Sequence, residues 1–425
     1  MLFAWLASTV RAGEIVSPGS PSKMDAGSGQ TSQDSASVFF NPANIRQTGN
    51  LLPTTNFSYV RITYGFTSSE VAEPPTAMTA TIPQAEGGLT WSYNRQLNIG
   101  AHVYPTGVGI MQAPRVPLET TSSEPSVVRF AMNEAGFKFG LGASYRLMPL
   151  ATLGFAAVIA HENYLYQLGD PDEKKAYFES NATASYNQFI VGWRGELIRR
   201  TLSGSASYRT AAAYKYTGTS LARFLGQKDA EALSGEGGYA PAILGGGAEY
   251  FLDQMRFFGE LTYELWASGR AAAHKPLPNQ NPETDFANAL TIGAGAEYTY
   301  DLINQFSIAY GYYPGNVGNG RNSTIISIDL ADRNGANGLT LGDINNLPHH
   351  SIGLGFRLKL RGKGYFHTGY QYATGSRDVP SEAPNAGTYT LKAHTVVFGV
   401  SYTFADFKET GHRPAKKPVK RKSEE

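Results

Sequence analysis

The sequence alternates apolar and polar residues with a period of two over most of its length. In SIGLGFRLKL, residues 351–360, Ile352, Leu354 and Phe356 fall on one face, and Ser, Gly, Arg and Lys fall on the other. Successive side chains of a β-strand point to opposite faces, so this period predicts strands with one apolar and one polar face. The same pattern recurs in FKFGLGASYR (137–146), FGELTYEL (258–265) and ALTIGAGAEYTY (289–300).

The alternation predicts fourteen strands, at 55–68, 87–96, 97–109, 127–147, 151–168, 183–199, 202–216, 239–252, 255–270, 286–301, 304–315, 347–361, 364–375 and 388–404. Short turns are expected near Asn94, Met148, Arg200, Asp253, Ile303 and Gly362, and long loops at 69–86, 110–126, 169–182, 217–238, 271–285, 316–346 and 376–387. Strands of about 9–11 residues or more, with short turns on one side and long loops on the other, are typical of outer-membrane barrels. We therefore expect an all-β fold, a 14-stranded antiparallel transmembrane β-barrel over residues 51–404.

A water-soluble β-sandwich or solenoid is the alternative fold. Strands in soluble sheets average about five or six residues, which is shorter than most of the stretches found here. The 425 residues include 47 Gly and no Cys, which excludes a disulfide scaffold and thiol chemistry. The formal net charge of +1 gives no indication of nucleic-acid binding. No apolar run is long enough to predict a transmembrane helix.

The two ends of the chain lack the alternation. Residues 1–12 have the character of the end of a secretory signal peptide, with VRA before the expected cleavage after residue 12. Residues 405–425 form a basic tail interrupted by Pro, which we expect to be disordered because it has too few apolar residues to bury.

The last strand ends in a short aromatic pattern. Gly399, Tyr402 and Phe404 have the spacing Gly-x-x-aromatic-x-aromatic. This spacing resembles the C-terminal signal that the barrel-assembly machinery recognises, although Phe404 is not the last residue of the chain.

Residues 13–50 precede the first strand and are rich in small and polar residues. The stretch AGSGQTSQDSAS leads to an apolar VFF and then to Asn41, Pro42 and Ala43. Pro42 fixes its own φ, and Asn41 can hydrogen-bond the neighbouring backbone in a turn, so we expect a compact, turn-rich segment. Because a wide barrel needs something inside its lumen to close it, we expect residues 13–50 to form an internal hatch.

This order of features resembles the outer-membrane long-chain fatty-acid transporters (FadL type). Their hatch carries small residues, an Asp-Ala-Ser-like stretch and an Asn-Pro-Ala signature, which here match residues 26–29, 34–37 and 41–43. The resemblance extends from about residue 13 to residue 404. It implies a fourteen-stranded barrel with the hatch inside, and passive uptake of long-chain fatty acids or aromatic hydrocarbons.

The third strand contains Tyr104, Pro105, Thr106 and Gly107. Pro105 cannot donate to the sheet ladder and Gly107 has no side chain, so a local break or bulge is expected there. The FadL-type family has an inward kink in its third strand that opens a lateral hole, and these four residues occupy the matching place. The alternative is that the strand simply ends at this point.

Basic residues on the polar face are candidates to hold a ligand carboxylate, as the resemblance implies. Strand alternation places Arg61, Lys138, Arg194, Arg209 and Lys215 in the lumen. Some family members use basic residues near the outer end of strand five, but here that end reads HENYLYQLGD, without Lys or Arg. The alternative is that the lumen charges pair with the acidic residues of the same face, Glu196, Glu249, Glu260 and Glu297.

No motif predicts catalysis, a metal ion or a cofactor. The Gly-x-Gly stretches lie within strands without P-loop spacing, and DLADRNGANGLTLGD (329–343) lacks the spacing of a calcium loop. We expect a non-enzymatic monomer of the cell outer membrane that takes up a hydrophobic small-molecule ligand, contacts outer-membrane lipid and lipopolysaccharide, and binds no nucleic acid. The alternative function is a non-transporting surface barrel, acting as an adhesin or a structural outer-membrane protein.

Overall fold

The structure is a computed structural model of the whole chain. It describes residues 30–32, 34–45, 51–68, 76–94, 96–112, 116–118, 126–148, 150–170, 175–222, 229–265, 288–300, 304–315, 347–360, 364–379 and 387–404. The expected signal-peptide remnant (1–12) and basic tail (405–425) lie outside these residues, as do parts of the expected hatch.

A short helix and a 3-10 turn precede a series of strands. The helix α2 spans Ser37–Phe40 and the turn η1 spans Pro42–Asn44. The strands are β1 (Leu51–Ser68), β2 (Thr76–Ser92), β3 (Leu97–Gln112), β4 (Val116–Leu118), β5 (Ser126–Met148), β6 (Ala151–Asp170), β7 (Lys175–Ile198), β8 (Leu202–Arg209), β9 (Ala212–Ala222), β10 (Glu231–Ala240), β11 (Ala242–Leu252), β12 (Met255–Leu265), β13 (Ala289–Tyr300), β14 (Asn304–Tyr313), β15 (His349–Lys359), β16 (Gly364–Val379) and β17 (Gly387–Tyr402).

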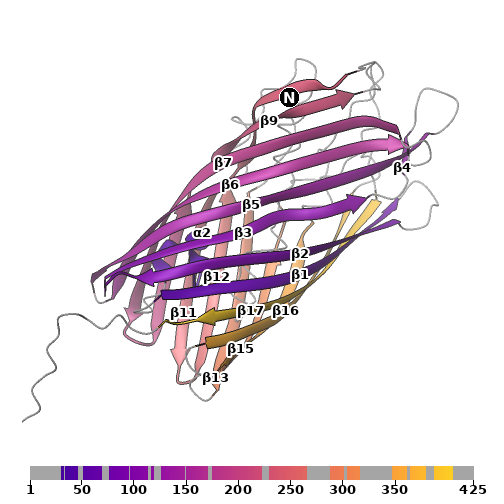
Figure 1. Cartoon of the computed structure of the whole chain (residues 1–425). Coiled ribbons are helices and arrows are strands. Elements are labelled where there is room, and N and C mark those ends of the chain that lie inside the picture. Colours follow the sequence, from indigo (N-terminus) through magenta and orange to yellow (C-terminus); the bar gives the residue numbers. More distant parts are fainter. Residues whose placement is uncertain are drawn as a thin grey trace, which may run out of the picture.

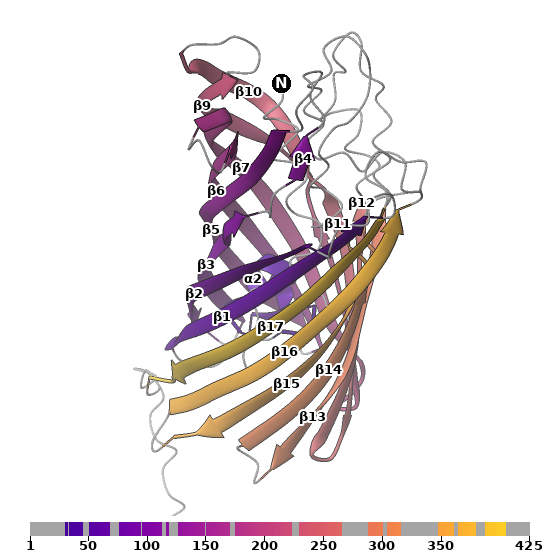
Figure 2. The ribbon, with the colours of Figure 1, turned by 90° about the vertical axis from the view of Figure 1, so that its right-hand side faces the viewer.

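The strands form one closed antiparallel barrel, since β1 pairs with β2 on one side and with β17 on the other (Figures 1 and 2). Both β8 and β9 pair with β7, so together they are one barrel strand interrupted at 210–211. In the same way β10 and β11 are one barrel strand interrupted at Pro241. The three-residue β4 pairs with the first residues of β5 and is not counted as a barrel strand. The predicted 14-stranded antiparallel β-barrel is therefore confirmed.

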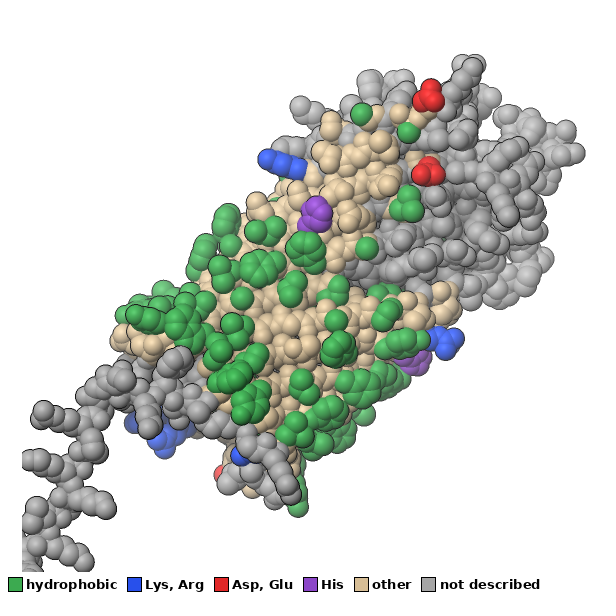
Figure 3. All heavy atoms as spheres, in the orientation of Figure 1, with side chains coloured by type: hydrophobic (Ala, Val, Ile, Leu, Met, Phe, Trp, Pro, Cys, Tyr) green, Lys and Arg blue, Asp and Glu red, His purple; other side chains and the backbone are tan. Residues whose placement is uncertain are grey.

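The barrel has its apolar side chains on the outside. In β15, Ser351 and Gly353 are buried on the inner face, whereas Ile352 and Phe356 are 52% and 44% exposed on the outer face. Figure 3 shows that outward hydrophobic side chains gather in a broad belt along the wall. In a soluble sandwich the apolar face would be buried, so the outward belt excludes that alternative and fits a wall in contact with lipid.

The short turns lie at one end of the barrel, as predicted. Arg200 (φ 62°) and Asp253 (φ 49°) take the left-handed conformation in the tight turns that join β7 to β8 and β11 to β12. The connections at the other end are longer, for example between Leu265 and Ala289. No helix in the described part of the chain is long and apolar enough to span a membrane.

Several strands extend further toward the long-loop end than the sequence predicts. The segments predicted as loops at 69–86, 169–182 and 217–238 are wrong in part, because β2 begins at Thr76, β7 begins at Lys175, and β9 and β10 cover much of the third. In the extension TAMTATIPQ of β2, Met78, Ala80 and Ile82 alternate with Thr79 and Thr81, but the buried Ile82 lies on the inner face whereas Leu89 is exposed on the outer face. The apolar residues therefore change face along β2, which interrupts the period of two and hides the continuation of the strand.

Candidate functional site

The described part of the expected hatch, residues 30–32 and 34–45, packs against the inner face of the barrel. Its hydroxyl Ser35 Oγ lies 2.8 Å from His102 Nδ1 of β3. Its amide Asn41 Nδ2 donates to the carbonyl oxygens of Trp193 (3.2 Å) and Ala206 (3.1 Å), on β7 and β8. Figure 2 likewise shows α2 enclosed by the strands. The segment therefore lies within the lumen.

Small residues in the wall make room for the Asn-Pro-Ala signature. A Cβ added to Gly154 of β6 would lie 2.1 Å from the amide nitrogen of Ala43, and one added to Gly192 of β7 would lie 2.0 Å from Asn41 Oδ1. Asn41 also caps the turn η1, because its Oδ1 accepts from Ala43 N at 3.1 Å, and Pro42 begins that turn. The signature is thus a turn that fits against the glycines of the wall.

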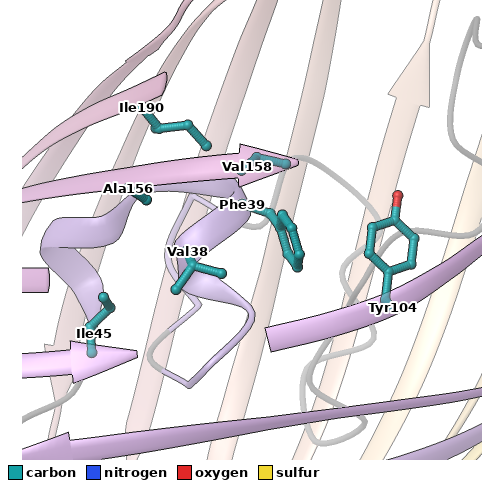
Figure 4. Close-up of a cluster of buried hydrophobic side chains, with 7 residues drawn as sticks. All are labelled: Val38, Phe39, Ile45, Tyr104, Ala156, Val158 and Ile190. Carbon is teal, nitrogen blue, oxygen red and sulfur yellow. The ribbon is translucent and has the colours of Figure 1, made fainter. Parts of the chain in front are cut away.

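An apolar cluster joins the hatch to one side of the wall (Figure 4). The hatch contributes Val38, Phe39 and Ile45, and the wall contributes Tyr104 of β3, Ala156 and Val158 of β6, and Ile190 of β7. The rings of Phe39 and Tyr104 meet edge to face, with centroids 5.3 Å apart. Figure 4 shows the Phe39 ring directed toward Tyr104.

The contact with Tyr104 falls where the ladder between β2 and β3 stops. Pairing runs from Ser92–Asn98 to Gly87–Val103, so Tyr104 is the first residue of β3 beyond it. Past this point β2 continues by pairing with β1, and β3 continues to Gln112 by pairing with β5.

The expected break at Tyr104, Pro105, Thr106 and Gly107 coincides with this ladder end. A register shift between Thr106 and Gly109 also interrupts the pairing of β3 with β5. The alternative of a strand end at this point is wrong, because β3 extends beyond it. The use of this ladder end as an exit for a ligand remains a prediction.

A network of charges holds the other side of the hatch. Arg256 of β12 pairs with Glu249 of β11, with Nε donating to Oε1 at 2.6 Å, and its Nη2 donates to the carbonyl of Thr31 at 3.1 Å. Arg194 of β7 pairs with the same Glu249. Thr31 in turn donates from both its amide and its hydroxyl to Glu260.

Part of the lumen charge is therefore paired, as the alternative predicts for Arg194 and Glu249. Glu249 accepts from two arginines, and Glu297 lies 3.6 Å from Arg256 Nη1. Glu196 lies apart at the short turn, where it accepts a hydrogen bond from Arg200 N. The sequence interpretation did not single out Arg256, although it shares a strand face with Glu260 in the alternation of β12.

Three of the five basic candidates lie on the inner face. Lys138 is buried, with Nζ 2.9 Å from Tyr104 Oη. Arg209 donates to the carbonyl of Phe39, and Arg194 lies 3.4 Å from Asn44 Oδ1.

Arg61 and Lys215 lie on the outer face, and the sequence prediction for both is wrong. In β1 the inward series passes through Thr54, which pairs with Gly88 beside the hatch, so Arg61 falls on the outward series with Phe57 and Tyr59. The apolar Val60 and Ile62 suggested the opposite orientation, but they are buried on the inner face.

Lys215 faces outward because the strand is interrupted at 210–211. Arg209 pairs with the inward Ile190, whereas Lys215 pairs with Ser185, an outward residue of the same β7. The interruption therefore reverses the alternation between β8 and β9, and strict parity fails across it.

The proposed assembly signal lies at the seam of the barrel. Phe404 N donates to Leu51 O at 3.0 Å, and the rings of Tyr402 and Phe404 meet on the exposed face with centroids 5.1 Å apart. Gly399 is buried beside Asn56 of β1, with no room for a Cβ. Recognition by the assembly machinery remains a prediction.

No protein-family profile and no curated protein matches the sequence. Solved structures match over nearly the whole chain. A FadL homologue of Pseudomonas aeruginosa superposes with a TM-score of 0.63 at 13% identity, covering 94% of this chain and 100% of its own. The toluene transporter TodX of P. putida gives 0.60 at 11% identity, covering 89% and 97%. The toluene transporter TbuX of Ralstonia pickettii gives 0.59 at 12% identity, covering 92% and 100%.

These similarities define the class of fold. The chain has the architecture of the FadL-type outer-membrane barrels, with fourteen strands around a segment in the lumen. Two of these three similar structures are described as toluene transporters.

Proposed function

We propose that the protein is a FadL-type channel of the outer membrane for passive uptake of a hydrophobic small molecule. The observation that carries the proposal is the contact between Phe39 of the hatch and Tyr104 of β3, at the end of the β2–β3 ladder. A movable apolar contact at this place lets a ligand pass from the lumen toward the wall.

The physical argument for a lateral exit starts from the backbone. Unpaired backbone groups are costly in lipid, so a break in the ladder persists only where protein or a wet cavity lies behind it. The hatch supplies that protein lining beside Tyr104. A ligand that displaces Phe39 would then leave between β2 and β3 into the bilayer, without crossing the periplasm.

The driving force is the removal of apolar surface from water. Each CH₂ group transferred from water to an apolar site contributes about 0.8 kcal/mol, so a long alkyl chain enters an apolar lumen without an energy source. The cluster around Val38 and Phe39 offers apolar surface in the described part of the lumen. A non-transporting adhesin has no use for such a cluster at a ladder end, and we therefore favour transport.

The substrate class is a long-chain fatty acid or an aromatic hydrocarbon. Two of the similar structures are described as toluene transporters. For a fatty acid, Lys138 is the candidate for the carboxylate, because its buried ammonium group lies beside Tyr104 at the proposed exit.

The test is uptake in a strain that lacks its own outer-membrane transporter for the ligand. Replacing Pro105 and Gly107 with Val restores an amide donor and favours regular pairing, so uptake of both ligand classes should fall severalfold while the folded barrel still reaches the membrane. The matched control is Pro53→Val in β1, which pairs with Leu89 where the β2–β3 ladder is intact. Undiminished uptake by the Pro105/Gly107 variant would exclude the lateral exit, and no uptake by the parent protein would exclude transport.

A further inference from the structure

A basic band lies on the outer face of the barrel, above the apolar belt. Arg61 of β1 is directly opposite His394 of β17, and His394 is directly opposite Tyr372 of β16. In the next row toward the long-loop end, Lys392 is opposite both Thr63 and Thr374. All of these residues belong to the outward series of their strands.

The two cations of this band are neighbours. Arg61 faces His394, and Lys392 is two residues from His394 on the same face of β17. Such diagonal neighbours in an antiparallel pair lie about 7–8 Å apart, within the joint reach of one phosphate group. Both side chains are exposed. Neither forms an ion pair with another residue that the structure describes.

Two matching tyrosine–histidine pairs lie on β14 to β17, on the side of the cations away from β2. The hydroxyl of Tyr370 on β16 is hydrogen-bonded to His394 Nδ1 at 2.8 Å, and the hydroxyl of Tyr310 on β14 is hydrogen-bonded to His350 Nδ1 at 2.6 Å. In each pair the tyrosine and the histidine lie on adjacent strands of the outer face. Each hydrogen bond fixes the orientation of its imidazole ring.

The rows below the band are apolar. Tyr59 is opposite Val396, and Phe57 is opposite Phe398, one and two rows nearer the short-turn end. Figure 3 shows a basic and a histidine side chain together at the edge of the hydrophobic belt. The band therefore lies at the level where acyl chains give way to head groups, on the side of the long loops.

The charge at this level is of one sign. Among the described residues, the two rows contain no outward Asp or Glu on β1, β2 or β14 to β17. The outward carboxylate of Asp378 lies further along β16, where it accepts a hydrogen bond from Thr388 Oγ1. A partner with several negative charges close together complements this band.

We propose that Arg61 and Lys392, with His394 and its tyrosine partner, bind the phosphorylated head group of an outer-leaflet glycolipid. Arg offers a planar fork of donors and Lys a point charge, and both suit phosphate. The acyl chains of the same lipid would cover Phe57 and Phe398 below. The proposal uses the outer-membrane placement proposed above, but it does not depend on transport.

The experiment measures binding of bisphosphoryl lipid A to the purified full-length barrel in detergent by native mass spectrometry. The Arg61→Gln/Lys392→Gln variant should bind at least about tenfold more weakly, a loss of about 1.4 kcal/mol, because it removes both cations that face the phosphate groups. The control is Arg199→Gln/Arg200→Gln, which removes the same charge from exposed residues at the short-turn end. It should bind as the parent does.

Four results would overturn the proposal. The first three are unchanged binding by the Arg61/Lys392 variant, an equal loss in the control, and binding of phosphatidylglycerol as tight as that of lipid A. Monophosphoryl lipid A should bind more weakly than the bisphosphoryl form, and equal affinity would also count against a multiply charged partner. Uptake of the hydrophobic ligand should be unchanged in the Arg61/Lys392 variant, so that this proposal and the transport proposal fail separately.

Discussion

Phe39 of the hatch contacts Tyr104 at the first residue of β3 that no longer pairs with β2. The Phe39 side chain therefore covers the point where the pairing between β2 and β3 ends. The backbone of Phe39 is bound as well, because Arg209 of β8 donates to its carbonyl oxygen. Phe39 thus links β3 and β8 through its ring and its backbone.

Removing the Phe39 ring should loosen this cover. Truncation of a buried Phe to Ala typically costs about 3–5 kcal/mol of packing free energy, so Phe39→Ala should let the hatch leave the break more often. We expect a higher ion conductance of the variant in planar lipid bilayers. Phe40→Ala on the same helix is the control, since Phe40 is only partly buried beside the cluster. Equal conductance of the Phe39→Ala variant and the parent would show that the ring does not close the path.

The fit between the signature turn and the wall gives a second prediction. Gly154→Ala places a Cβ against the backbone of Ala43 and should displace the turn, whereas a Cβ at Gly259 meets nothing within 4 Å. The chain has no cysteine, so Asn41→Cys introduces a single thiol at a buried site. Labelling of this thiol by a large impermeant maleimide should be slow in the Asn41→Cys background and in its Gly259→Ala variant.

In the Gly154→Ala variant the same labelling should be severalfold faster. Heat-dependent mobility on gels checks that each barrel is folded. Fast labelling of the Asn41→Cys protein without a further substitution would contradict the internal hatch. Slow labelling of this protein and of both its glycine variants would contradict the tight fit at Gly154.

The Arg–Glu network should stabilise the barrel with its hatch in place. Glu249→Gln leaves Arg194 and Arg256 without their shared carboxylate, and breaking a buried pair in this way typically costs about 3–5 kcal/mol. We expect a lower urea midpoint of unfolding, followed by tryptophan fluorescence. Glu196→Gln is the control, because Glu196 only accepts a 3.4 Å hydrogen bond at the short turn. A midpoint unchanged by Glu249→Gln would show that the network adds no net stability.

The sequence predicts this fold well wherever side chains meet two different environments. In β15 lipid lies outside and the lumen inside, so Ile352 and Ser351 alternate cleanly and the strand bounds follow. Beyond the lipid belt this difference disappears, and in the extension of β2 from Thr76 the apolar Ile82 lies on the inner face whereas Leu89 lies on the outer face, so the pattern of the lipid-facing stretch does not continue into the extension.

The orientation of single charges is predicted less well, for local reasons. Arg61 lies where the apolar residues change from the outer to the inner face, and Lys215 lies beyond an interruption that reverses the alternation. The contact of Phe39 with Tyr104 could not be predicted either, because it joins segments distant in sequence and depends on how the turn at Asn41 orients the hatch.

The last prediction separates the two ligand classes. Lys138→Met keeps the length and the apolar packing of the side chain but removes its ammonium group from beside Tyr104. If Lys138 binds the carboxylate, the concentration of a long-chain fatty acid that gives half-maximal uptake should rise about tenfold, since a hydrogen bond to a charged group contributes about 1.5–3 kcal/mol. Uptake of toluene, which has no carboxylate, should be unchanged. Lys215→Met makes the same replacement on the outer face and should affect neither ligand. A loss of toluene uptake equal to that of the fatty acid would mean that Lys138 supports the structure of the passage, and that another residue binds the carboxylate.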